Sequence, residues 1–227
     1  MSIDLVQYLN DRDQKHESGQ STIRPFITIS RETGCHSRLI ANQLQQEINR
    51  LTGKKWPIIS KEIIIDAAKE LDINPLQVKH ILNAHEKNHL EEILLAFGEH
   101  RYKSYQNVQN TLKNFISQVA ANGHNIIIGR AGAIITSGMA GGIHVRLMAP
   151  LPWRIKSISQ QMVISEQEAA NFVKETDQKR NKLYMLFSGK ELRQDYFDLI
   201  LNNQRISDKE IVSLILLFME QRGFLKK

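Results

Sequence analysis

Short apolar runs alternate with helical patterns from residue 26 onward, and this alternation limits the fold more than any other feature of the sequence. Five runs have the length and composition of buried strands: 26–29, 56–59, 125–128, 143–149 and 196–201. The run 125–128 is continuous and apolar, which is typical of a strand buried in a parallel sheet. We therefore predict an α/β fold with three layers, in which a five-stranded parallel sheet lies between helices.

Capping residues mark the ends of several helices. Apolar residues recur at helical spacing from Leu39 to Leu51, and Gly53 is predicted to end that helix. Ser165 and Ser207 are each followed three residues later by glutamate. This spacing predicts two capping boxes, each of which opens one of the last helices of the chain.

The chain divides into a short N-terminal segment and one domain. Residues 1–24 combine a short apolar helix face with a polar stretch, which predicts a loosely attached helix and linker before the domain at 25–227. The stretch at about 61–121 is predominantly helical and is longer than a simple crossover between strands needs. It is therefore predicted to form a lobe over one edge of the sheet.

The composition narrows the class of partner. The formal net charge of +6 suits an anionic partner, either nucleotides or nucleic acid, although a modest charge excess is also ordinary for a soluble protein. Cys35 is the single cysteine, which excludes an intrachain disulfide and a zinc site built from cysteines. No apolar run approaches the ~20 residues that span a membrane, and the N-terminus lacks the pattern of a signal peptide. A cytoplasmic protein without a membrane partner is predicted.

Residues that suit phosphate binding follow the first, third and fourth predicted strands. Parallel sheets bind ligands at the carboxyl ends of their strands. The residues at that edge are Ser30, Arg31, Gly34, Cys35, His36, Ser37, Arg38, Gly129, Arg130, Gly132, Pro150, Trp153 and Arg154. Arginine pairs well with phosphate oxygens, and helix N-termini add partial positive charge. Any one arginine or glycine has an ordinary explanation as a surface or turn residue, but their coincidence at one edge predicts a ligand with several phosphates.

The strict phosphate-loop pattern GxxxxGK[ST] is absent, because the loop after the first strand has no lysine. The run from Ile27 to Ala41, ITISRETGCHSRLIA, nevertheless resembles the opening of the cytidylate kinase-like family, ITISRE-x-GSGGREIA. Further segments resemble the family in the same order: KEII from Lys61, NIIIGR ending at Arg130, HVRLMAPLPWR ending at Arg154, TDQKR from Thr176 and FDLILN from Phe197. The resemblance extends over residues 26–215.

This resemblance implies a P-loop kinase-like fold, in which 61–121 is a helical nucleotide-binding insert and 153–190 is a helical lid. It implies transfer of the γ-phosphoryl group of ATP to a nucleoside monophosphate such as CMP, with Mg²⁺. The implied ATP phosphate-binding residues are Ser30, Arg31, Gly34, Cys35, His36, Ser37 and Arg38. The implied acceptor-binding residues are Lys61, Arg130 and Asp177. The implied catalytic residues are Arg38, Arg154 and Arg180, and no metal ligand of the protein is implied.

The chain also departs from the family pattern in its phosphate loop. His36 and Ser37 stand where the family has glycine, Ser60 stands where it has aspartate, and Leu39 occupies the position of the Mg²⁺-binding hydroxyl of stricter cytidylate kinases. Glycine permits backbone angles and a close approach that side chains obstruct, so weak ATP binding is predicted.

Two alternatives remain open at this point. The substituted loop and the segment before the domain suit a catalytically weak or inactive relative that binds a nucleotide and acts through protein interaction. A nucleic-acid-binding protein ranks last, because the basic residues form no stripe interleaved with aromatic residues. The phosphoryl acceptor and the oligomeric state stay open, and a homo-oligomer is compatible with the sequence.

Overall fold

The computed structural model describes residues 23–60, 109–190 and 192–225. Lys61, most of the predicted insert and all but the last two residues of the predicted N-terminal segment lie outside these ranges. None of the described helices is long and apolar enough to cross a membrane.

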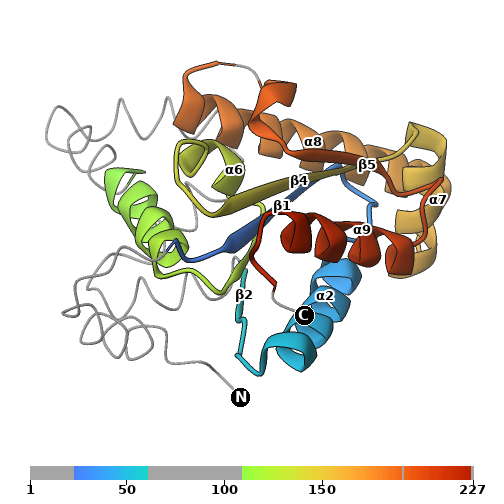
Figure 1. The fold of residues 1–227 in the computed structure, drawn as a ribbon. Helices are drawn as coiled ribbons and strands as arrows, with labels where there is room; N and C mark the ends of the chain where they lie inside the picture. The colour runs from blue at the N-terminus through green and yellow to red at the C-terminus, as the bar shows by residue number, and fades with distance from the viewer. Residues whose placement is uncertain (1–22, 61–108, 191, 226–227) are drawn as a thin grey trace, which may run out of the picture.

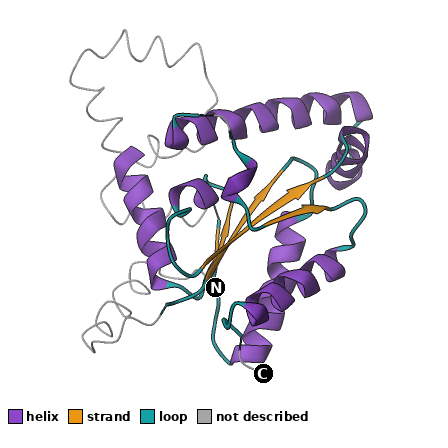
Figure 2. Cartoon of the chain, turned by 45° about the horizontal axis from the view of Figure 1, so that its top comes forward, coloured by secondary structure: helices purple, strands orange, loops and turns teal. Residues whose placement is uncertain are grey.

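The predicted five-stranded parallel sheet is confirmed (Figures 1 and 2). The strands lie in the order β2-β3-β1-β4-β5. Their bounds are β1 Phe26–Arg31, β2 Ile58–Ile59, β3 Ile126–Ile128, β4 Gly142–Met148 and β5 Leu199–Asn202. The central strand β1 places Ile27 between Ile126 of β3 and Ile143 of β4. All four pairings are parallel, so the carboxyl ends of the strands meet at one edge.

Helices cover both faces of the sheet (Figure 1). One face carries α2 Ser37–Thr52 and α9 Asp208–Gln221, which also pack against each other. The other face carries α6 Gly132–Ile135, the helical residues 109–122 and the long helix α8 Glu166–Ser188. Helix α7 Leu151–Met162 packs on α8 and lies near the carboxyl ends of the strands. This end of the sheet is therefore framed by the start of α2, by α7 and by α8.

The core follows the alternation of side chains along the strands. Ile27 and Ile29 point toward α2 and α9 and belong to one apolar cluster with residues of both helices, including Ile40, Leu44, Ile48, Ile211 and Ile215. Burying a side chain of this size contributes about 1.5–3 kcal/mol. Between these two isoleucines, Thr28 points to the opposite face, where its hydroxyl lies 2.8 Å from Nδ1 of the buried His144. A smaller cluster joins α6 to α8.

The capping residues act as predicted. Gly53 takes the left-handed conformation, with φ of 66°, at the end of α2. Ser165 and Ser207 each accept a hydrogen bond from the amide of the glutamate three residues on, and both capping boxes are complete. The predicted last strand begins later than expected, because residues Gln194–Tyr196 form a 3-10 helix. Ser30 and Arg31 lie in β1 rather than in the following loop, because pairing with β4 continues through Leu147.

Candidate functional site

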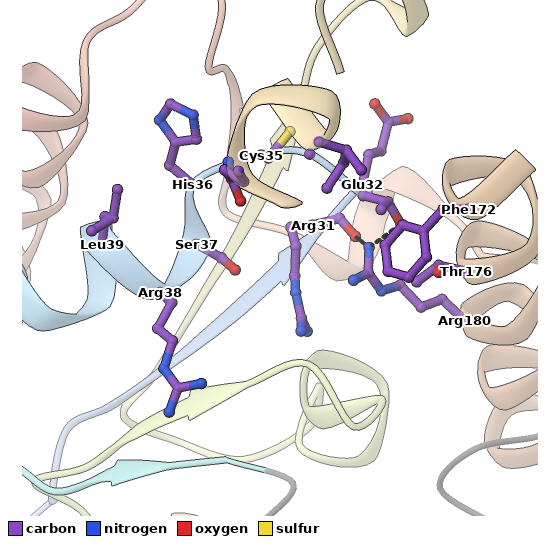
Figure 3. A pocket seen from close by; sticks show the side chains of 14 residues that line it. Arg31, Glu32, Cys35, His36, Ser37, Arg38, Leu39, Phe172, Thr176 and Arg180 are labelled. Carbon is purple, nitrogen blue, oxygen red and sulfur yellow. Dashed lines mark hydrogen bonds between the residues drawn. The ribbon is translucent and has the colours of Figure 1, made fainter. Parts of the chain in front are cut away.

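A cavity of about 240 Å³ opens where β1 ends, beside the loop of residues 32–36 that joins β1 to α2. We call this segment the β1–α2 loop. Residues 31–39 line one side of the cavity, and α7 and α8 supply the rest through Ile158, Gln161, Phe172, Thr176 and Arg180 (Figure 3). The cavity therefore lies at the edge where the sequence predicts a ligand.

The cavity is strongly basic. Arg31, Arg38 and Arg180 line it, and among its described lining residues Glu32 alone is acidic. Arg31 and Arg38 extend to the same side of the loop in Figure 3, while Arg180 reaches the loop from α8. Burial lowers the pKa of Arg180, and the Asp177 carboxylate acts in the opposite direction. Three guanidinium groups around one cavity suit a ligand with several negative oxygens.

Asp177 ties helix α8 to the β1–α2 loop. Its Oδ1 accepts hydrogen bonds from the amide of Thr33 at 2.8 Å and from the hydroxyl of Thr33 at 2.6 Å. Its Oδ2 accepts from Nη1 of Arg154 at 2.7 Å. Arg180 Nη1 lies 3.4 Å from Oδ1 and donates to the Thr33 hydroxyl at 2.8 Å. One carboxylate thus fixes the loop against two arginines of the predicted lid.

Arg154 lies beneath the β1–α2 loop and is not among the residues that line the basic cavity. Its side chain is buried, and its Nε donates to the carbonyl of Ala149 at 2.9 Å and lies 3.4 Å from Oε2 of Glu32. Its Nη1 also donates to the carbonyl of Thr33 at 3.3 Å. Arg154 therefore supports the loop in this structure, and its charge is balanced by Asp177 and Glu32.

Gly34 is the position of the loop that requires glycine. Its φ is 97°, and a Cβ there would lie 2.6 Å from the carbonyl oxygen of Arg154. Its own carbonyl accepts a hydrogen bond from Ser157 Oγ at 2.8 Å. The loop thus packs directly on the backbone of α7, with no room for a side chain.

His36 does not require glycine. Its φ of −80° and ψ of 39° avoid the left-handed region, so the backbone angles at this position do not call for glycine. The imidazole points to the opposite side of the loop from Arg31 and Arg38 in Figure 3. It contacts Asp208 of α9, and its ring lies 5.2 Å from that of Trp153.

Several amides of the β1–α2 loop already have partners within the protein. Cys35 N–H donates to the carbonyl of Glu32 at 3.3 Å, and Ser37 N–H donates to the carbonyl of Cys35 at 2.9 Å. His36 N–H donates to Oδ1 of Asn203 at 2.7 Å. The sequence resemblance implies that amides of this segment wrap phosphates, and three of them would have to exchange partners to do so.

The turn after β3 holds an unusual backbone. Gly129, Arg130 and Ala131 have φ values of 71°, 58° and 53° in succession. A left-handed conformation costs roughly 1–2 kcal/mol for a residue other than glycine. Gly129 also lies against the Arg31 guanidinium, which a Cβ at this position would strike. Arg130 is thus held at the carboxyl edge of the sheet by a strained turn, and such strain is frequent at ligand sites.

A second, larger cavity of about 620 Å³ adjoins the first, because His36, Leu39 and Gln161 line both. It is completed by Trp153, Lys156, Ser157 and Gln160 of α7. Its walls combine an aromatic ring, one cation and two amides.

Glu32 is the acidic side chain among the described residues that line the basic cavity. Across the described ranges, no group of three or more histidine, cysteine, aspartate or glutamate side chains could hold a metal ion. Mg²⁺ commonly binds through one or two carboxylates together with substrate phosphates. Glu32 is the carboxylate that fits this role, although its Oε2 also accepts from the amide of Ala149 at 3.1 Å.

The remaining predicted site residues are placed as follows. Ser30 and Ser37 are buried, in β1 and at the first position of α2, and Cys35 packs against the apolar cluster under the loop. Lys61 lies outside the described residues. Sequence reasoning missed Thr33, Asn203 and Asp208. Asn203 directly follows β5 and Thr33 lies in the loop after β1, so the rule on strand ends could have found both, whereas nothing local marks Asp208.

Cys35 is expected to be a poor nucleophile despite its position in the loop. Burial, reinforced by the Glu32 carboxylate, raises the pKa of its thiol from 9.0 to about 12. The thiolate is the reactive species, so alkylation by iodoacetamide at pH 8 should be roughly 1,000-fold slower in the folded protein than in urea. Mass spectrometry of timed samples measures both rates. Equal rates would contradict the buried placement of the thiol.

Two solved structures match this chain over most of its length. An uncharacterized protein from Eubacterium ventriosum matches with a TM-score of 0.62 and 17% identity, over 87% of this chain and 99% of that one. A shikimate kinase from Bacteroides thetaiotaomicron matches with a TM-score of 0.41 and 12% identity, over 88% of this chain and 98% of that one. The first likeness supports the α/β fold.

Comparison with curated proteins gives a partial match. A uronate isomerase from Corynebacterium glutamicum is 27% identical over 108 residues, which is 47% of this chain and 20% of that protein. The chain thus spans about a fifth of the length of the curated relative that it matches. The model of the cytidylate kinase-like family matches residues 26–205, which include the whole sheet, the β1–α2 loop and both α7 and α8. The chain therefore belongs to the cytidylate kinase-like family.

Proposed function

We propose that the protein transfers the γ-phosphoryl group of ATP to a nucleoside monophosphate of the cytidylate type. Membership of a kinase-like family supports phosphoryl transfer to a nucleotide-type substrate as the class of reaction. The observation that carries the proposal is the basic cavity, where Arg31, Arg38 and Arg180 meet at the carboxyl edge of the sheet. Phosphoryl transfer needs positioning and neutralisation of charge, which arginines supply.

The donor nucleotide would lie across the two adjoining cavities. Its phosphates would occupy the basic cavity at the N-terminus of α2, where the helix adds partial positive charge. Its base would enter the larger cavity and stack on Trp153. Glu32 would help to hold Mg²⁺ at this cavity, and the ion would supply positive charge against the phosphate oxygens.

The acceptor would bind near the strained turn after β3. Arg130 is the cation of that turn, and its backbone is held in a conformation that is costly for arginine. Lys61 and Asp177 complete the acceptor-binding residues in this proposal. Asp177 could serve the acceptor only after releasing Thr33, because its Oδ1 accepts the hydrogen bonds that the amide and the hydroxyl of Thr33 donate.

Catalysis would rest on Arg38 and Arg180, which line the basic cavity. Arg154 would reach the transferring group only where Asp177 releases it, since its Nη1 binds that carboxylate at 2.7 Å. In the arrangement described above, Arg154 acts as a support for the loop.

A second candidate function is a nucleotide-binding relative with weak or absent turnover. The specific observation in its favour is the β1–α2 loop, where the amides of Cys35, His36 and Ser37 are already hydrogen-bonded. Fewer amides then remain for phosphate oxygens, and binding of ATP weakens accordingly.

A coupled ADP-release assay with MgATP and a panel of nucleoside monophosphates tests the proposal. Arg38→Ala and Arg130→Ala should each lower kcat/KM roughly 10- to 100-fold, the effect of losing a charge-assisted phosphate contact. Arg50→Ala is the matched control, because Arg50 is exposed at the end of the same helix α2 and pairs with Glu47. Loss of activity only in the two cavity variants is the expected result.

Two other outcomes have distinct meanings. Calorimetric binding of MgATP without ADP release from any acceptor would favour the binding relative over the kinase. Absence of MgATP binding would count against both functions.

A further inference from the structure

Three residues close a ring of hydrogen bonds around the β1–α2 loop. The amide of His36 donates to Oδ1 of Asn203 at 2.7 Å, and Nδ2 of Asn203 donates to Oδ1 of Asp208 at 2.9 Å. The carboxylate of Asp208 accepts in turn from Nδ1 of His36, at 3.0 Å to Oδ2 and 3.2 Å to Oδ1. A carboxylate can only accept, so Nδ1 carries the proton in this contact. The ring ties the loop after β1 to the segment between β5 and α9.

The ring is held by its surroundings. Asn203 is buried, and its own amide donates to the carbonyl of Met148 at the end of β4. On the other side of the imidazole, Trp153 packs at 5.2 Å between ring centroids, and Nε2 lies 3.4 Å from Ser157 Oγ. Contacts from α7 and α9 thus converge on the imidazole, while the segment after β5 binds the backbone amide of the same residue.

A serine, a histidine and an aspartate in this order could also suggest a hydrolytic triad, but the hydrogen bonds argue against it. Ser157 Oγ donates its single proton to the carbonyl of Gly34 at 2.8 Å and accepts from Gln161 at 2.9 Å. The hydroxyl therefore has no proton to give to Nε2 in this arrangement. Ser157 is also buried, so it is poorly placed to attack a substrate.

We propose that His36 is a positioning residue, which through Asn203 and Asp208 holds the start of α2 so that Arg38 stays at the basic cavity. This inference rests on the proposed function, because that function supplies the phosphate ligand. It adds the residue that fixes the position of the loop. The ring fixes the direction of the peptide between Cys35 and His36, and it anchors the start of α2, where Arg38 follows two residues later. Where the family has glycine, His36 thus adds a side-chain hydrogen bond to Asp208, which we call the tether.

Replacing His36 with asparagine or with glutamine distinguishes a hydrogen-bonding role of the imidazole from simple packing. His36→Asn places an amide nitrogen where Nδ1 lies, and His36→Gln places it where Nε2 lies. The tether runs through Nδ1, so the asparagine variant should keep it, whereas the glutamine and alanine variants should lose it. A side chain that merely fills space would instead favour the larger glutamine.

The test uses the full chain and two readouts: amide hydrogen exchange of residue 36, and calorimetric binding of inorganic tripolyphosphate. His36→Asn should keep both within about threefold of the unaltered protein. His36→Gln, His36→Ala and Asp208→Ala should each speed the exchange and weaken the binding roughly 10-fold or more, as expected for loss of a hydrogen bond to a charged group. Lys209→Ala, at the exposed neighbour of Asp208, is the matched control and should change neither.

The failures are distinguishable. If the unaltered protein does not bind tripolyphosphate, the phosphate site of the proposed function is absent. If it binds but the asparagine and glutamine variants behave alike, or Asp208→Ala leaves the exchange slow, the positioning role of His36 is overturned while the phosphate site stands.

Discussion

Replacing Asp177 with alanine is expected to lower the free energy of unfolding by about 3 kcal/mol. The change removes one carboxylate that accepts from the amide and hydroxyl of Thr33 and from Nη1 of Arg154. It also leaves the buried Arg154 with Glu32 as its remaining acidic partner in the described structure. Removing one partner of a buried ion pair costs more than the pair contributes, because the other charge stays in a poorly solvated place. Urea unfolding followed by circular dichroism measures the loss, which corresponds to a fall in Tm of about 6–12 °C.

Two further variants identify the cause of that loss. Asp195→Ala removes an exposed ion pair with Arg193 and should leave the stability unchanged within error, since exposed pairs contribute little. Adding Arg154→Met to Asp177→Ala removes the buried charge that the first change leaves behind, so the double variant should regain part of the stability. An Asp177→Ala protein as stable as Asp195→Ala would show that the carboxylate does not fasten α8 to the loop.

The architecture follows from patterns that are local in the sequence. β3 is a continuous apolar run, the other strands are short and largely apolar, and both capping boxes depend on residues three positions apart, so pattern and spacing are sufficient to predict them. The site could be located from the same information, because the topology of a parallel sheet brings the ends of β1, β3 and β4 to one edge. Arg31, Arg38 and Arg130 lie at that edge as predicted.

Local patterns could not predict which site residues contact one another. Thr33 and Asp177 are 144 positions apart, and His36 and Asp208 are 172 apart. Such contacts depend on how α8 and α9 pack against the sheet, which no local pattern records. The family resemblance implies a catalytic role for Arg154, whereas in the structure its partners are Asp177, Glu32 and two carbonyl groups.

The sequence also could not predict the backbone angles of the β1–α2 loop. The resemblance draws attention to His36 because the family has glycine there, yet the positive φ of the loop lies at Gly34, at 97°, and the φ of His36 is −80°. A left-handed turn at Arg130 and Ala131 carries no sequence signal beyond the preceding Gly129. Backbone strain is determined by the surrounding packing, so it becomes visible only once the fold is complete.

Gly34→Ala is expected to destabilise the protein by about 3–5 kcal/mol and to weaken tripolyphosphate binding at least 10-fold. Alanine at a φ of 97° costs roughly 1–3 kcal/mol, and its Cβ would lie 2.6 Å from the carbonyl oxygen of Arg154, so α7 or the loop must shift. That shift would disturb the Ser157 hydrogen bond to Gly34 and the Arg154 contacts beneath the loop. Gly53→Ala is the matched control: its φ is 66° but nothing lies within 4 Å of the added Cβ, so only about 1 kcal/mol should be lost and binding should not change. Urea unfolding and calorimetry measure both quantities, and equal losses in the two variants would show that the loop does not pack on α7 as described.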